Sequence, residues 1–208
     1  MLRRVSLMLL LALVPAWGLQ AQDKTFTILF LGDSLTAGYG LDENQSFPSL
    51  IADKLDAEGR DDIRILNGGV SGSTSASGLS RLQWYLHSQP DLMLLALGAN
   101  DGLRGLSVTE LESNLRATIE LAQDNGIQVA LAGMLIPPNL GPEYTDAFAA
   151  VFPALAAEYK LPFLAFLLDG VAADPALNQS DGIHPNAAGA RIVADRVYQF
   201  LQPLLPAS

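Results

Sequence analysis

Only two side chains of this sequence are histidines, and both cysteine and any third histidine are absent from its 208 residues. A thiolate nucleophile, a disulfide and a three-histidine metal site are therefore excluded. His184 follows Asp181 by three residues in the segment Asp181-Gly182-Ile183-His184-Pro185-Asn186. This spacing can bring a carboxylate to one imidazole nitrogen and leave the other to activate a serine. Capping of a following helix is the alternative role for this segment.

His87 stands in a helical stretch without an acidic neighbour, and we interpret it as a surface or packing residue.

Ser34 is the candidate nucleophile. It lies in Gly32-Asp33-Ser34-Leu35-Thr36, directly after an apolar run that is typical of a buried strand. A serine at this point can present its hydroxyl at the carboxyl edge of a sheet. The Gly-Asp-Ser tripeptide alone is weak evidence, because all three residues are common in turns. It also differs from the Gly-x-Ser-x-Gly elbow, since Thr36 replaces the second glycine.

Two further segments offer hydrogen-bond donors. The run 67–74, Asn-Gly-Gly-Val-Ser-Gly-Ser-Thr, has closely spaced glycines that let backbone N–H groups approach a ligand. It lacks the Gly-Lys-Ser/Thr of a nucleotide-binding loop, and a tight turn is its simpler interpretation. Asn100, in Gly98-Ala99-Asn100-Asp101, carries an uncharged amide that can donate to an oxyanion. A helix cap or a turn is the alternative role for Asn100.

The elements that must position these residues alternate between short apolar runs and amphipathic stretches. This pattern predicts one α/β domain, a three-layer α/β/α sandwich with a central parallel sheet of about five strands. In such sheets, ligands bind at the carboxyl ends of the strands, where all four segments fall. The predicted strands are Phe26–Leu31, Ile63–Leu66, Leu92–Leu97, Val129–Met134 and Phe163–Phe166, and the predicted helices cover about 46–58, 74–88, 107–125, 143–159 and 187–202.

Taken together, these motifs resemble the SGNH, or GDSL-type, serine hydrolase family, whose fold is flavodoxin-like. The resemblance covers the chain after its first 21 residues. It is closest to a periplasmic group of multifunctional thioesterases, lysophospholipases and arylesterases. The segments that carry it are Gly-Asp-Ser-Leu-Thr-Ala-Gly-Tyr at 32–39, Asn-Asp-Gly-Leu-Arg-Gly at 100–105 and Asp-Gly-Ile-His-Pro-Asn at 181–186.

The resemblance implies a hydrolase that forms an acyl-enzyme on Ser34, with His184 as the general base and Asp181 orienting it. It also implies that the oxyanion is held by the backbone N–H groups of Ser34 and Gly72 and by the side chain of Asn100. No metal or organic cofactor is implied. The chain departs from the group at Ser73, where an aspartate is usual, which leaves the backbone role of Gly72 unaffected.

The substrate implied by the resemblance is a small-molecule acyl ester or thioester. Apolar residues on the loops after the third and fourth strands offer a wall for an acyl chain, and we expect Ile136 and Pro137 to contact it. Some of these residues could instead cap the core. Two alternatives stay open, a carbohydrate O-deacetylase on the same fold and a non-catalytic lipid-binding protein. The apolar loop residues are Leu103, Leu106, Leu135, Ile136, Pro137, Pro138 and Leu140.

The basic start of the chain, the short apolar run after it and the absence of cysteine predict an exported protein, periplasmic or secreted. Residues 1–21 combine Arg3 and Arg4 with an apolar run too short to span a bilayer, as in a signal peptide, and 22–208 form the hydrolase domain. An uncleaved anchor is the alternative. Cleavage removes two arginines and no acids, which moves the formal charge from −10 to −12. This charge argues against nucleic acid or an anionic membrane as partner. We expect a monomer without stable membrane insertion.

Overall fold

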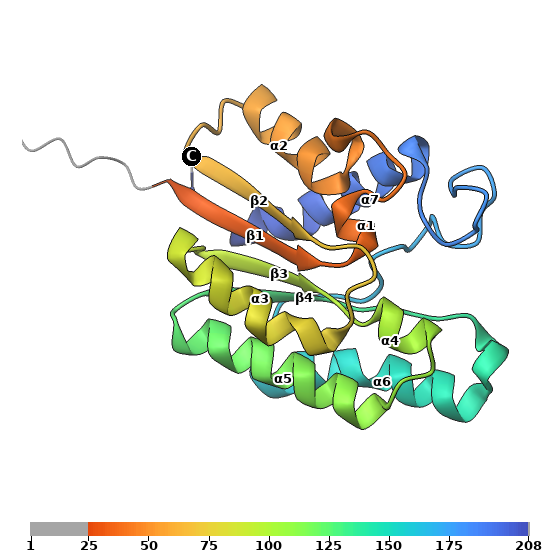
Figure 1. The fold of residues 1–208 in the computed structure, drawn as a ribbon. Coiled ribbons are helices and arrows are strands. Elements are labelled where there is room, and N and C mark those ends of the chain that lie inside the picture. The colour runs from red at the N-terminus through yellow and green to blue at the C-terminus, as the bar shows by residue number, and fades with distance from the viewer. Residues whose placement is uncertain (1–24, 208) are drawn as a thin grey trace, which may run out of the picture.

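The computed structural model describes residues 25–207, and the predicted signal peptide at 1–21 lies outside them. Five parallel strands form one sheet in the order β2-β1-β3-β4-β5 (Figure 1). This architecture confirms the predicted sandwich and its strand number. The strands are β1 (Phe26–Gly32), β2 (Ile63–Gly69), β3 (Leu92–Ala96), β4 (Gln128–Ala132) and β5 (Phe163–Leu164).

The central strands are apolar along their whole length because helices cover both faces of the sheet. All five residues of β3 are buried, and so are six of the seven residues of β1. β5 is shorter than the predicted Phe163–Phe166 and pairs with β4 through only two residues. The edge strand follows Pro162, which has no N–H to donate to a ladder.

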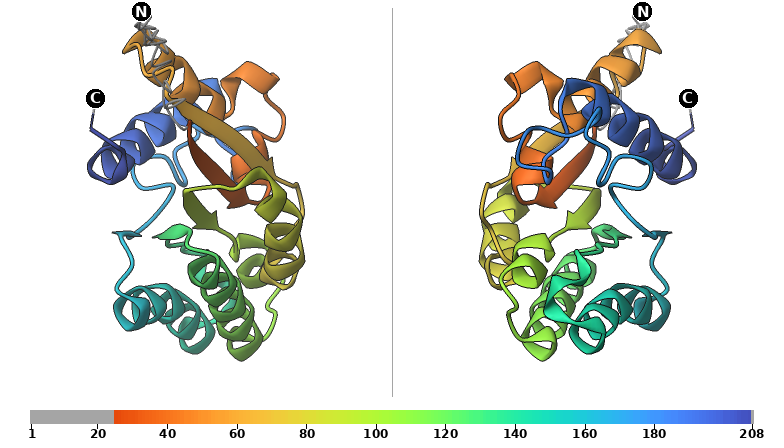
Figure 2. Two further views of the ribbon diagram at one scale, coloured as in Figure 1. Left: turned by 90° about the vertical axis from the view of Figure 1, so that its left-hand side faces the viewer. Right: turned by 90° about the vertical axis from the view of Figure 1, so that its right-hand side faces the viewer.

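Two layers of helices enclose the sheet (Figures 1 and 2). Helices α2 and α7 pack together on one face, while α5 packs against both α3 and α6 on the other. This division follows from right-handed crossovers between parallel strands. The helices are α1 (Ser34–Ala37), α2 (Phe47–Ala57), α3 (Gly78–Tyr85), α4 (Ala99–Leu103), α5 (Val108–Asp124), α6 (Pro142–Tyr159) and α7 (Ala187–Leu201).

Polar side chains cap the starts of α5 and α7. The Ser107 hydroxyl accepts the backbone N–H of Glu110 at 3.2 Å, and Asn186 caps α7 through the N–H groups of Ala188 and Gly189. No helix within residues 25–207 has the length and apolar character needed to cross a membrane.

The strand order decides which loops become neighbours. β1 lies between β2 and β3, so the turn after β1 lies between the loop after β2 and the turn after β3. The segment 165–186, between β5 and α7, returns across the same edge of the sheet (Figure 1). The fold thus gathers at one edge the four segments that the sequence singled out.

Candidate active site

Ser34 is the first residue of α1, directly after β1. Asp33 caps this short helix, because its Oδ1 accepts the backbone N–H of Leu35 at 3.0 Å. Gly32 is needed for the tight entry: a Cβ there would lie 1.9 Å from Thr36 Oγ1. The Ser34 hydroxyl is consequently held at the carboxyl edge of the sheet, half-buried, as the motif predicts.

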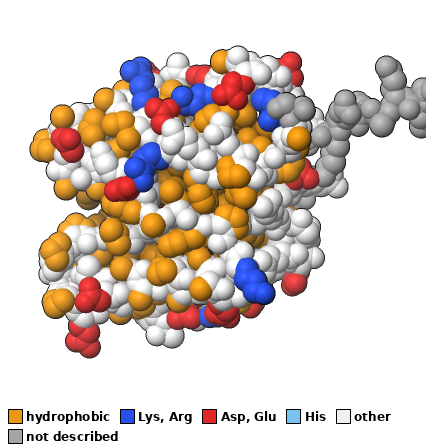
Figure 3. All heavy atoms as spheres, turned by 180° about the vertical axis from the view of Figure 1, so that it is seen from behind, with side chains coloured by type: hydrophobic (Ala, Val, Ile, Leu, Met, Phe, Trp, Pro, Cys, Tyr) orange, Lys and Arg blue, Asp and Glu red, His pale blue; other side chains and the backbone are white. Residues whose placement is uncertain are grey.

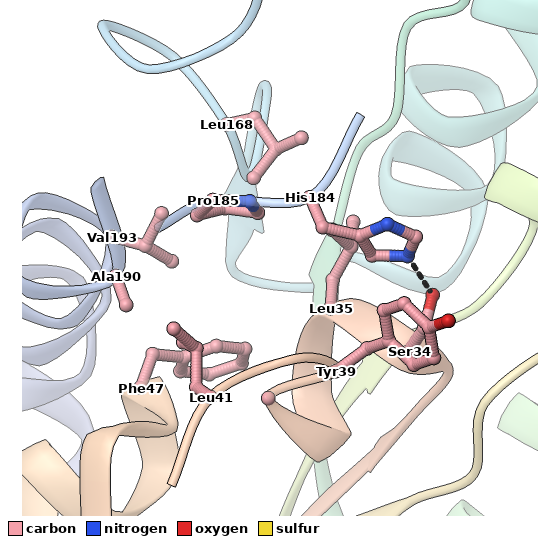
Figure 4. Close-up of a pocket in the computed structure, with 11 residues that line it drawn as sticks. Ser34, Leu35, Tyr39, Leu41, Phe47, Leu168, His184, Pro185, Ala190 and Val193 are labelled. Atoms are coloured by element: carbon pink, nitrogen blue, oxygen red, sulfur yellow. Dashed lines mark hydrogen bonds between the residues drawn. The ribbon is translucent and has the colours of Figure 1, made fainter. Parts of the chain in front are cut away.

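Ser34, His184 and Asp181 form a continuous chain of contacts. The Oγ of Ser34 lies 2.8 Å from His184 Nε2 (Figure 4). On the other side of the ring, His184 Nδ1 lies 2.7 Å from Asp181 Oδ2. With Nδ1–H donating to the carboxylate, Nε2 is the acceptor for the serine proton. The structure therefore brings together the three side chains that the sequence analysis names as candidate nucleophile, base and orienting acid.

The carboxylate of Asp181 stays ionised throughout the neutral range. Its Oδ1 accepts the backbone N–H of His184 at 3.0 Å and of Ile183 at 2.9 Å. These two bonds, together with the His184 side chain, lower the pKa of Asp181 to about 2. A fixed negative charge next to the imidazole can stabilise the imidazolium that forms when His184 takes a proton.

A third contact to the imidazole, after those of Ser34 and Asp181, was not predicted from the sequence. The ring of Tyr39 lies against His184, with the ring centroids 4.7 Å apart. Gln179 Nε2 donates to the carbonyl oxygens of Tyr39 at 2.6 Å and of Pro185 at 3.0 Å, so it ties the two flanking loops together. The sequence around Gln179 does not indicate this role, because Tyr39 is 140 residues away in the chain.

Gly72 and Asn100 lie beside Ser34. All three line one cavity of about 250 Å³, which His184 lines as well. Gly72 has φ of +79°, a backbone conformation that glycine adopts without strain. Asn100 Nδ2 donates to the carbonyl oxygen of Ser73 at 3.0 Å. An amide nitrogen carries two hydrogens, so this bond leaves one for an oxyanion.

A buried carboxylate connects the two loops that carry Gly72 and Asn100. Asp101 is 3 % exposed and accepts both the backbone N–H of Ser75 at 2.8 Å and its hydroxyl at 2.6 Å. Arg104 adds a guanidinium bond to the Gly72 carbonyl at 3.1 Å. These charge-assisted bonds set the distance between the candidate oxyanion donors. Sequence reasoning missed Asp101, because its partner is 26 residues away.

An apolar groove of about 370 Å³ begins at this cavity and shares Leu35, Ala99, Leu103 and Ile183 with it. Hydrophobic side chains gather along the hollow at this end of the molecule (Figure 3). Its lining includes the expected substrate contacts Ile136 and Pro137, together with Met134, Leu135, Pro138, Phe166, Leu168, Ala172, Ala173 and Gly182.

Two of the residues expected in the apolar wall lie outside this groove. Leu106 and Leu140 are absent from its lining and are 40 % and 41 % exposed. The α4–α5 turn carries Leu106 outward, and Leu140 reaches toward Gly105 beside it. The expectation that they form the wall was therefore wrong.

His87 lies far from this site in the fold, on the 3-10 turn after α3, where its ring packs against Trp84 at 4.8 Å. This position agrees with a surface packing role. Within residues 25–207, no three His, Asp or Glu side chains cluster in a way that could hold a metal ion.

Asp33 gives the site a pH-dependent effect on stability. Its side chain is fully buried, and burial raises its pKa to about 6 from an ordinary value of 3.8. Folded protein therefore binds this proton more tightly than unfolded chain. Protonated Asp33 thus contributes roughly 3 kcal/mol to the free energy of unfolding. This contribution is complete below about pH 4 and is lost as the pH rises through about 6.

We therefore expect Asp33→Asn to change the pH profile of stability. Asparagine keeps the oxygen that accepts the Leu35 N–H but carries no charge to bury. Its melting temperature relative to the parent should rise between pH 4 and pH 7, as measured by calorimetry. A difference that stays constant across this range would contradict the burial argument.

Comparison with known proteins agrees with these observations. Residues 30–192 match the model of the GDSL-like Lipase/Acylhydrolase family. The chain is 40 % identical over 188 residues to Esterase TesA of Pseudomonas aeruginosa, which covers 90 % of this chain and 93 % of that protein. It is 38 % identical over 180 residues to Thioesterase 1/protease 1/lysophospholipase L1 of Escherichia coli K12, covering 86 % and 85 % of the two chains.

A solved structure extends the agreement to the fold. The psychrotrophic esterase EstA from Pseudoalteromonas sp., in a form inhibited by monoethylphosphonate, superposes with a TM-score of 0.82 at 36 % identity. The match covers 86 % of this chain and 97 % of that one. On the family match, the relatives and the shared fold, the chain belongs to the GDSL-like lipase/acylhydrolase family.

Proposed function

We propose that this protein is a serine hydrolase that cleaves carboxylic esters and thioesters of acyl chains through an acyl-enzyme on Ser34. The observation that carries the proposal is the 2.8 Å contact between Ser34 Oγ and His184 Nε2, with Asp181 behind the imidazole. The relatives named as esterase and thioesterase support the same reaction class.

The proposed reaction runs in two halves. Ser34 Oγ attacks the acyl carbonyl carbon while His184 Nε2 takes the hydroxyl proton, and the carbonyl oxygen becomes an oxyanion. Collapse of this intermediate expels the alcohol or thiol, which receives the proton from His184. In the second half, His184 deprotonates a water that attacks the acyl-enzyme, and the acid leaves with Ser34 restored.

The proposed oxyanion site combines the backbone N–H groups of Ser34 and Gly72 with the Asn100 side chain. Donors held in place before the reaction stabilise charge that develops only in the transition state. The bonds of Asp101 to Ser75 and of Arg104 to Gly72 supply this preorganisation. Asp101 and Arg104 are thus positioning residues in this proposal.

The shape of the groove favours an acyl chain as the group bound beside Ser34. Its named lining is apolar apart from glycine backbone, so a fatty chain would lose contact with water over much of its length. A sugar needs polar partners for its hydroxyls, which argues against the deacetylase alternative. A non-catalytic lipid binder would have no use for the Ser34–His184 contact.

We expect the purified protein to hydrolyse p-nitrophenyl esters and acyl-CoA thioesters. Burial of about 0.8 kcal/mol per methylene predicts that kcat/KM rises by up to about 10²-fold from acetyl to a six-carbon chain. An acetylated sugar should be cleaved far more slowly than either. If the acetylated sugar were the best substrate of the series, the acyl-chain assignment would fail.

Export is the second part of the proposal. We infer that residues 1–21 form a signal peptide and that 22–208 function as the hydrolase domain in the periplasm or outside the cell. N-terminal sequencing of protein recovered after export should begin near Gln22 or Asp23. Recovery of the full-length chain in the membrane fraction alone would contradict this.

A further inference from the structure

Five large apolar side chains surround the mouth of the groove without being covered by the chain. Leu103, Leu106, Leu135, Leu140 and Ile183 are each between 40 % and 51 % exposed, and we call them the apolar rim. Three of them, Leu103, Leu135 and Ile183, also line the groove. The rim is therefore continuous with the path by which an acyl chain enters.

The two remaining rim residues have no role in the groove. Leu106 lies on the turn after α4. The side chain of Leu140 lies beside Gly105 on the same turn, 3.5 Å from where a Cβ would stand. Tyr144 holds this turn in place, because its hydroxyl donates to the Leu106 carbonyl at 2.7 Å. The fold thus fixes two leucines in water beside the groove, where neither fills the core nor contacts the proposed substrate site.

The charges near the rim restrict what can cover it. Within the loop segments 97–107, 133–142 and 165–186, the sequence contains a single Lys or Arg, Arg104. Its guanidinium bonds inward to Gly72 and Asn100. After Leu140, helix α6 carries two exposed acidic residues, Glu143 and Asp146. An anionic surface would be repelled here, whereas a zwitterionic one meets an apolar rim without opposing charge.

We propose that the apolar rim adsorbs this protein to zwitterionic phospholipid surfaces, with the groove opening onto the lipid. Rim side chains would enter the interface between headgroups and acyl chains and bury apolar area there. A lipid chain could then pass into the groove without crossing bulk water. The inference adds a surface-binding step to the proposed hydrolase function, and binding itself requires no turnover.

Flotation with phosphatidylcholine vesicles tests this inference. The experiment uses exported protein carrying Ser34→Ala, so that no lipid is hydrolysed. Leu106→Ser combined with Leu140→Ser should weaken the vesicle partition coefficient by about tenfold or more, because both leucines lose their transfer energy. Trp84→Ser is the matched control, since Trp84 on α3 is 64 % exposed and distant from the groove. It should bind as the parent does.

Activity separates this inference from the proposed function. In the wild-type background, the Leu106→Ser/Leu140→Ser variant should retain its kcat/KM for water-soluble p-nitrophenyl butyrate within about twofold, because neither residue lines the groove. If the wild-type protein did not hydrolyse the ester but still bound vesicles, the proposed function would be overturned and the rim proposal would stand.

Four results would overturn the rim proposal itself. The first is parent-like vesicle binding by the double variant, and the second is no vesicle binding by the parent. The third is tighter binding to phosphatidylglycerol than to phosphatidylcholine vesicles, which would contradict the charge argument. The fourth is a dimer in sedimentation that the double substitution dissociates, because a second copy of the chain would then be what covers the rim.

Discussion

Ser34→Ala is expected to lower kcat by about 10⁴-fold or more, because no other group can then form the acyl-enzyme. The hydroxyl makes its one side-chain contact with His184 Nε2, and the half-buried site can hydrate the imidazole once the hydroxyl is gone. The fold should remain intact. Steady-state kinetics with a p-nitrophenyl ester and circular dichroism on the same preparation measure both effects.

Ser71→Ala is the matched control for this substitution. Ser71 lines the same cavity as Ser34 and Gly72, yet its hydroxyl is not in contact with His184. Its removal should leave kcat within about threefold of the wild type, far less than the loss of a nucleophile. Equal losses in the two variants would mean that Ser34 has no special role.

Asn100→Ala is expected to lower kcat by about 10²–10³, with KM little changed. The amide donor matters most when the carbonyl oxygen carries full negative charge, so its loss costs transition-state binding of about 3–4 kcal/mol. Asn100 also donates to the Ser73 carbonyl, and that bond joins two loops. Some loss of thermal stability should therefore accompany the kinetic effect.

Ser75→Ala separates these two roles of Asn100. It removes one of the bonds between the same loops, from the Ser75 hydroxyl to Asp101, but leaves the Asn100 amide in place. It should lower the melting temperature and keep kcat within about threefold, because the backbone N–H of Ser75 still bonds to Asp101 and keeps the two loops together. If Asn100→Ala behaves in the same way, Asn100 is a structural residue and not an oxyanion donor.

Most of the fold could be predicted because its signals are local. The apolar runs of β1 and β3 are continuous, which indicates strands buried on both faces. Ser107, three residues before Glu110, predicts the start of α5. The turns α1 and α4 were missed, since helices of four and five residues have no measurable periodicity. β5 was predicted too long because its pairing depends on a neighbour that the sequence does not show.

The site residues that could be predicted are likewise those whose signals are local. Ser34, Asp181 and His184 lie in short motifs, and the contacts within the Asp181–His184 pair span only three residues. Tyr39, Gln179 and Asp101 were missed because each acts through a partner that only the folded chain brings close. Leu106 and Leu140 show the opposite error: both are apolar, as a wall residue would be, but the turn after α4 and the 3-10 turn before α6 leave them exposed to solvent.

These long-range contacts also explain how the fold serves the proposed chemistry. β1 places Ser34 between the loops of Gly72 and Asn100, and Asp101 ties those two loops together. The segment before α7 brings His184 from the far edge of the sheet, and Gln179 joins it to the Tyr39 loop. Each proposed catalytic group is thus held by at least two elements, as preorganisation requires.

Reaction with a fluorophosphonate tests the central proposal most directly, because the phosphorus mimics the tetrahedral intermediate and stays on the nucleophile. Mass spectrometry of the intact protein should show a single adduct, and peptide sequencing should place it on Ser34. Ser34→Ala protein should remain unmodified under the same conditions, while Ser71→Ala protein is labelled like the wild type. An adduct on any other residue, or labelling that persists in Ser34→Ala, would contradict the assignment of Ser34 as the nucleophile.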